Sequence, residues 1–156
     1  MKHAASFTRK DLEIDSMNSI YEMDYQVGSR DFAAAGDASR SIKRTLQQIG
    51  VDTSVVRRIA IASYEAEMNI AIHSKGGKMC LSVNSDKVVV STEDFGPGIE
   101  NVELAMTEGW STATAEIREM GFGAGMGLPN MKKCADEFFI ESKISEGTKI
   151  KMIFKL

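Results

Sequence analysis

The sequence lacks any apolar run long enough to cross a bilayer, and its first residues, MKHAASFTRKDLEIDS, contain no hydrophobic signal core. It also lacks a cluster of lysine and arginine, and its net charge of −3 gives no electrostatic footprint for nucleic acid. Only two cysteines occur, Cys80 and Cys134, far apart and in mostly apolar settings. That pattern is typical of reduced core thiols rather than of a metal pair. These absences predict a cytoplasmic protein that binds neither membranes nor nucleic acid.

The remaining composition is that of an ordinary globular protein. Apolar residues make up 43% and charged residues 26% of 156 residues, enough for one domain with a full hydrophobic core. No internal repeat or low-complexity linker divides the chain. We therefore expect one domain over residues 1–156, with residues 1–18 as a loose lead-in.

Hydrophobic spacing and turn residues predict the order of the elements. Apolar residues at helical spacing from Phe32 and Ala35 to Ile49 indicate a helix that ends at Gly50. A second helix begins at an N-cap near Asp52 and is stopped by Gly76-Gly77. The expected elements are a strand at 19–27, helices at 29–50 and 52–77, a hairpin at 78–94 with its turn at 84–86, a short helix-like piece at 100–109, a helix at 128–138, and two strands in 138–156.

This order predicts an α+β fold, a two-layer sandwich with a mostly antiparallel sheet and helices on one face. The strict alternation of strand and helix that marks a doubly wound nucleotide-binding fold is missing.

Glu65 and Asn69 lie four residues apart on the second expected helix and so share one face, whereas Glu67 lies about 200° away round that helix. A carboxylate can take a proton, and an amide oxygen one turn further can ligate a cation such as Mg²⁺. For the pair alone, a solvated polar face is the simpler interpretation. The largely apolar residues around the pair, however, indicate a buried helix, in which polar groups need partners.

The segment TEDFGPGIEN, residues 92–101, follows an expected strand. Asp94 at the strand end is placed to accept a hydrogen bond from a ligand amine, and the glycines after it let a flat ring approach the backbone. Taken alone, the same residues also describe an ordinary turn.

The segment GFGAGMGL, residues 121–128, places alternate glycines before a helix. Glycines of this kind allow consecutive N–H groups to form an anion-binding nest, and the helix N-terminus adds its dipole. The spacing fits neither the dinucleotide fingerprint nor the P-loop, because Met126 or Leu128 stands where the former needs glycine and Leu-Pro follows Gly127. A mobile hinge without a ligand is the alternative.

Together and in this order, the three segments resemble the motifs of the GHKL (Bergerat-fold) ATPases. Glu65 and Asn69 match the N box, DFGPGI (94–99) the first glycine box, GFGAGMGL the second, and EGTKIKM (146–152) the closing Gly-Thr strand. The likeness covers most of the chain from about residue 20. The segments MTEGWST and LPNMKKCADEFFIES further resemble the small bacterial anti-sigma factor and switch-protein serine/threonine kinases, with the switch kinases of stress-signalling modules the nearer group.

The resemblance implies ATP and Mg²⁺ as cofactors, with nucleotide held between helices and sheet. Glu65 would activate the attacking hydroxyl of a partner, Asn69 would ligate Mg²⁺, and Asp94 would bind the adenine amine with support from Thr148. Residues from about Glu108 to Gly127 would form an ATP lid. The implied nucleotide-binding residues are Asn69, Asp94, Gly96, Gly98, Ile99, Gly121, Gly123, Ala124, Gly125, Met126, Gly127, Leu128 and Thr148.

Some residues stay ambiguous within the resemblance. Glu67 stands where the family often has a small or apolar residue, although helix geometry favours Glu65 as the acting carboxylate. His73 matches a common family histidine, yet a core histidine at a helix end is the favoured interpretation. Arg118 lies in a charged lid segment, where a solvated helix is favoured over contact with phosphate.

The resemblance implies phosphorylation of a serine or threonine on a STAS-domain antagonist of an anti-sigma factor. One alternative is an anti-sigma factor that mainly sequesters a sigma factor, and another is a nucleotide-sensing ATPase without a protein substrate. A PP2C-type phosphatase is a further expected partner. Dimerisation through the first strand and helix stays open.

Overall fold

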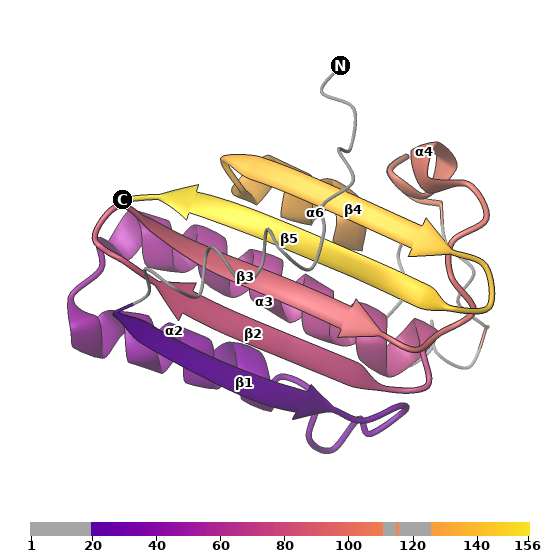
Figure 1. Ribbon diagram of the computed structural model, residues 1–156, viewed down its shortest axis with the longest axis horizontal. Helices are drawn as coiled ribbons and strands as arrows, with labels where there is room; N and C mark the ends of the chain where they lie inside the picture. Colours follow the sequence, from indigo (N-terminus) through magenta and orange to yellow (C-terminus); the bar gives the residue numbers. More distant parts are fainter. Residues whose placement is uncertain (1–19, 111–114, 116–125) are drawn as a thin grey trace.

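The computed structural model describes residues 20–110, 115 and 126–156. One layer is a five-stranded antiparallel sheet in the order β1-β2-β3-β5-β4, and helices α2, α3 and α6 cover one of its faces (Figure 1). The bounds of the elements are β1 Tyr21–Val27, α2 Asp37–Ile49, α3 Thr53–His73, β2 Gly77–Val83, β3 Lys87–Asp94, α4 Val102–Ala105, α6 Gly127–Cys134, β4 Glu137–Lys143 and β5 Gly147–Lys155. The predicted α+β sandwich is confirmed.

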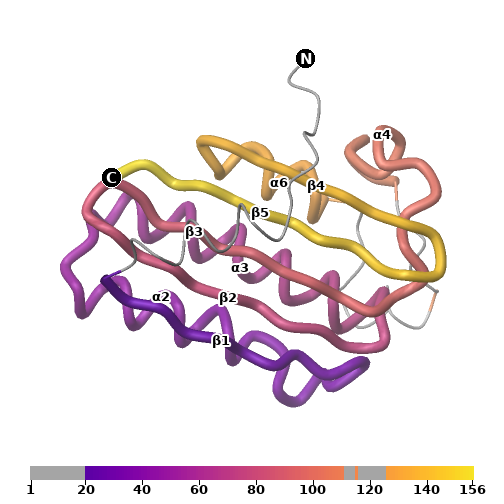
Figure 2. Tube along the Cα trace, in the orientation of Figure 1, coloured from indigo at the N-terminus to yellow at the C-terminus, as the bar shows by residue number. Residues whose placement is uncertain are grey.

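The core lies between the sheet and α3, which packs against both α2 and α6 and runs behind the middle strands (Figure 2). Side chains alternate along each strand, so every second residue faces the helices. Met79 and Leu81 of β2, Val90 of β3, and Met152 and Phe154 of β5 are fully buried on that face. This packing holds α3 firmly against the strand ends that carry the candidate site.

The α2 helix begins at Asp37, so the predicted start at residue 29 is wrong. Gly36 has a φ of 97° and interrupts the helical backbone just before it. Phe32 and Ala35 lie in turns, and their side chains pack against Met68 and the neighbouring Ile72 of α3. Their helical spacing therefore reflects a shared packing face rather than a helix.

Two other helices end earlier than predicted. The α3 helix ends at His73 rather than at Gly77, because Ser74 is already extended and β2 starts at Gly77. The α6 helix ends at Cys134 rather than at Phe138, since the chain enters β4 at Glu137. The predicted N-cap is confirmed, because the Asp52 side chain accepts a hydrogen bond from the Ser54 N–H.

The predicted hairpin turn is also confirmed. The Asn84 side-chain oxygen accepts hydrogen bonds of 2.8 Å from the N–H groups of Asp86 and Lys87, and β2 pairs with β3 on either side. Within the described residues, no helix is both long and apolar enough to span a membrane.

Candidate nucleotide site

A pocket of about 1170 Å³ opens between α3, the glycine-rich end of the sheet, α4 and the start of α6. Glu65 and Asn69 of α3 line it, together with Asp94 at the end of β3 and Gly127 at the start of α6. The residues that the sequence places in three separate motifs therefore lie around one cavity.

Asp94 is held in place by the backbone on both sides of it. Its Oδ1 accepts a hydrogen bond of 2.9 Å from the Gly96 N–H and one of 3.2 Å from the Thr148 N–H. The Thr148 hydroxyl instead pairs with the Ser142 hydroxyl at 2.8 Å. Thr148 thus supports Asp94 directly, through its backbone N–H. The Asp94 side chain is half-buried and lines the pocket.

The loop after β3 is pressed so closely against the β4–β5 turn that glycine is required in both. A Cβ on Gly98 would lie 2.3 Å from the carbonyl oxygen of Lys143, and φ is +76° there. A Cβ on Gly147 would lie 2.0 Å from the carbonyl oxygen of Asp94, with φ at +123°. The Ser145 N–H also donates to the Pro97 carbonyl at 2.8 Å. These contacts fix the pocket wall beside Asp94.

The start of α6 approaches the polar face of α3 just as closely. A Cβ on Gly127 would lie 3.2 Å from Asn69 Oδ1 and 3.3 Å from Glu65 Oε2. The N–H groups of a first helical turn have no partner inside the helix, and they carry the positive end of its dipole. The two side-chain oxygens and the helix end therefore face a common region of the pocket.

Burial changes the proton affinity of three side chains in the pocket. It raises the pKa of Glu65, which a hydrogen bond from Asn130 partly offsets. It also raises the pKa of Asp94, against the lowering effect of the Gly96 and Thr148 N–H groups. It lowers the pKa of His73, which favours the neutral imidazole.

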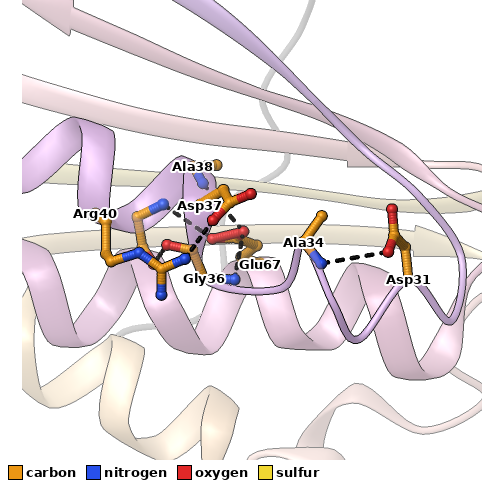
Figure 3. A network of polar contacts seen from close by, with 8 residues as sticks. Asp31, Ala34, Gly36, Asp37, Ala38, Arg40 and Glu67 are labelled. Atoms are coloured by element: carbon orange, nitrogen blue, oxygen red, sulfur yellow. Dashed lines mark hydrogen bonds and ion pairs between the residues drawn. The ribbon is translucent and has the colours of Figure 1, made fainter.

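Glu67 points away from the pocket, as the helix geometry predicts. Its side chain is 2% exposed, and its two oxygens accept hydrogen bonds from the N–H groups of Gly36 at 2.9 Å, Ala38 at 3.2 Å and Ser39 at 2.9 Å (Figure 3). The α2 helix has no cap from its own N-cap residue. Glu67 supplies that cap from α3, a role that the sequence does not reveal.

The structure does not place every candidate residue at the pocket. Gly98, Ile99, Met126, Leu128 and Thr148 line it. Gly96 does not, and a Cβ there would lie 2.9 Å from the Ser74 Cβ. The remaining candidates lie outside the described residues, namely Gly121, Gly123, Ala124, Gly125 and Arg118, with most of the expected lid.

Sequence reasoning missed Asn130, whose Nδ2 donates to Glu65 Oε1 at 3.4 Å, and Trp110, which lines the pocket. The position of Asn130 in the first turn after the second glycine box is the signal that would have found it.

The model of the histidine kinase-like ATPase domain matches residues 29–154. The chain is 31% identical over 127 residues to the serine/threonine-protein kinase RsbT of Bacillus subtilis, covering 79% of this chain and 87% of that protein. It is 32% identical over 99 residues to the anti-sigma F factor of a Thermoanaerobacter strain, covering 60% and 66% respectively.

Two solved structures share the fold. The RsbU and RsbW domains of Rv1364c from Mycobacterium tuberculosis align with a TM-score of 0.60 at 18% identity, over 87% of this chain and 32% of that one. A chain of the SiaB-SiaC complex from Pseudomonas aeruginosa aligns with a TM-score of 0.57 at 12% identity, over 94% and 100%. Because the family model matches residues 29–154 and a relative is 31% identical over 127 residues, this chain belongs to the histidine kinase-like ATPase domain family, as the GHKL resemblance predicts.

Proposed function

We propose that this chain is an ATP-dependent protein kinase that phosphorylates a serine or threonine of a STAS-domain antagonist of an anti-sigma factor. The observation that carries the proposal is the single pocket that gathers Glu65, Asn69, Asp94 and Gly127. Family membership and the relative named as a serine/threonine-protein kinase support the same activity.

The pocket has the size and chemistry that a nucleotide needs. Its lining includes the apolar Ile99 and Ile150 together with Asp94, whose Oδ1 accepts the Gly96 N–H. Asp94 would accept a hydrogen bond from an exocyclic amine. Pockets of several hundred cubic ångströms with few polar groups are typical of small-molecule sites. Adenine would lie at Asp94, and the phosphates would lie toward Gly127 at the start of α6.

Mg²⁺ would bind at this site together with the phosphates of the nucleotide. Within the described residues, no group of three or more His, Cys, Asp or Glu side chains could hold a metal. Mg²⁺ usually takes one or two protein ligands and completes its shell with phosphate oxygens and water. Asn69 Oδ1 would be the protein ligand, and the ion would neutralise phosphate charge.

In the proposed mechanism, Glu65 acts as the general base, and its position on the pocket lining supports that role. In the proposed step, the partner hydroxyl oxygen bonds to the γ-phosphorus, the bond from that phosphorus to the ADP oxygen breaks, and Glu65 takes the hydroxyl proton. Asn69 and the first turn of α6 hold the phosphates while this happens. Glu67 has no part in the step, because its carboxylate is occupied by the α2 backbone.

The test is transfer of labelled phosphate from ATP to a panel of STAS-domain proteins encoded beside the gene, scored on serine and threonine. We expect Glu65→Ala to bind a fluorescent ATP analogue normally and to lose at least about 100-fold in transfer rate. Glu137→Ala, an exposed carboxylate on β4, serves as the matched control and should transfer as the wild type does. A normal transfer rate in Glu65→Ala would exclude Glu65 as the base.

Similarity to proteins named anti-sigma F factor favours a second candidate, in which the chain sequesters a sigma factor. Capture from lysate in the presence of ATP or ADP separates the two. Recovery of a sigma factor supports sequestration, whereas recovery of a STAS protein or a PP2C-type phosphatase supports the kinase role. Steady phosphate release with no labelled protein would instead indicate a nucleotide-sensing ATPase.

A further inference from the structure

The first turn of α6 places Asn130 against Glu65. Asn130 Nδ2 donates to Glu65 Oε1 at 3.4 Å, and both side chains are half-buried. The backbone that carries Asn130 is fixed, because its N–H donates to the Met126 carbonyl at 2.9 Å and the adjacent Pro129 and Met131 are buried. The amide therefore meets the carboxylate from a well-anchored position.

The two oxygens of Glu65 lie in different surroundings. Oε1 receives the Asn130 amide, while Oε2 lies 3.3 Å from the point where a Cβ of Gly127 would be, next to Asn69 Oδ1. Oε2 therefore faces the start of α6, the region assigned above to phosphate. A carboxylate held by one oxygen keeps the other in a constant direction.

We infer that Asn130 is a positioning residue for the reaction: it holds Oε1 of Glu65, so that Oε2 is presented to the hydroxyl of the protein substrate. The inference rests on the proposed role of Glu65 as general base. An amide suits this task because it donates a hydrogen bond without carrying charge. A lysine would instead form an ion pair, and a carboxylate would repel Glu65.

Attachment of α6 to α3 does not depend on this contact. At the other end of α6, Arg58 Nη1 donates to the Cys134 carbonyl at 2.9 Å and lies 3.6 Å from Asp136 Oδ1. Met131 is fully buried between the two ends. Loss of the Asn130 amide should therefore leave α6 in place and change only how Glu65 is held.

The experiment compares wild type, Asn130→Ala, Asn130→Asp and the control Lys132→Ala, an exposed residue of the same helix. For each variant, the phosphate-transfer assay gives kcat and KM for ATP. Separate measurements give the affinity for a fluorescent ATP analogue and the melting temperature. We expect Asn130→Ala to lower kcat roughly 10- to 100-fold with nucleotide affinity within about twofold, since a misplaced base costs rate rather than binding. Asn130→Asp should lose more, and Lys132→Ala nothing.

A double-mutant cycle with Glu65→Ala decides whether the effect passes through Glu65. If Asn130 acts by holding the base, Asn130→Ala should add no further loss once Glu65 is absent. A normal kcat, a loss seen only in nucleotide affinity, or a full additional loss in the Glu65→Ala background would overturn the inference.

The outcome can be separated from that of the proposed function. If wild type transfers no phosphate to protein but hydrolyses ATP, the kinase assignment fails, and the same cycle run on hydrolysis still tests Asn130. If wild type binds ATP and does neither reaction, both proposals fail.

Discussion

At the scale of single residues, two glutamates two positions apart, with only Ala66 between them, have different roles. Glu65 lines the pocket, and Glu67 is buried against the start of α2. Helical periodicity alone separates them, because residues two apart on a helix point in nearly opposite directions. The face that each occupies was predictable from the sequence. The cap that Glu67 provides was not, because it depends on a turn at Gly36 that brings the α2 N-terminus to α3.

Replacing Glu67 should destabilise the fold without touching the pocket directly. Glu67→Ala leaves buried N–H groups of Gly36, Ala38 and Ser39 without their acceptor, at a cost of about 2–4 kcal/mol in the free energy of unfolding. Glu67→Gln keeps one acceptor oxygen and should lose less. Urea denaturation measures both, with Glu137→Ala as an exposed control. A change below about 0.5 kcal/mol in Glu67→Ala would show that the cap contributes little to stability.

At the scale of elements, the sequence predicts the order of strands and helices well and their limits less well. Alternating strand residues and the Asn84 turn fix the hairpin, because both signals are local. Phe32 and Ala35 led to a predicted helix start that is too early. Apolar residues at helical spacing also occur in turns that pack against a helix, as these two do against α3. The end of α6 could not be predicted either. The helix stops at Cys134 because the chain must enter β4 at Glu137, and β4 forms only by pairing with the distant β5.

At the start of α6, Gly127 lies close to two side chains of α3. Gly127 is not among the glycines with a positive φ, so an alanine there is compatible with the helical backbone. Its methyl group, however, would displace the side-chain ends of Asn69 and Glu65, from which it would lie 3.2 and 3.3 Å away. Gly127→Ala should therefore leave the melting temperature unchanged or slightly raised while weakening nucleotide binding. Thermal unfolding and titration with a fluorescent ATP analogue measure the two effects, and tight binding by the variant would show that the close approach is not functional.

At the scale of the whole molecule, the pocket exists only when sheet and helices are assembled. Asp94 and Thr148 come from strands β3 and β5, Glu65 and Asn69 from α3, and Gly127 from α6. The motifs were visible in the sequence because their spacing resembles a known family. The contacts between them, such as Asn130 with Glu65, were not visible, because residues 65 positions apart meet only through the packing of α6 on α3.

Because unfolding disperses these residues, ATP should stabilise the folded chain by mass action. At a nucleotide concentration about 100 times Kd, the expected gain is about 2.7 kcal/mol, which corresponds to roughly 5–11 °C in melting temperature for a chain of this size. Asp94→Asn replaces the acceptor carboxylate with an amide and should reduce the gain at equal ATP.

The stabilisation of the folded chain by ATP should decrease as the pH falls. Burial raises the pKa of Asp94 in the folded state, so its carboxylate takes up a proton at a higher pH than in the unfolded chain. This proton uptake favours the folded state without ligand as the pH drops, but it removes the charged acceptor that adenine requires. In the wild type, the rise in melting temperature caused by ATP should therefore decrease as the pH is lowered past the raised pKa of Asp94. In Asp94→Asn, that rise should stay nearly constant over the same pH range. An ATP-induced shift with the same pH dependence in both proteins would mean that Asp94 does not bind the base.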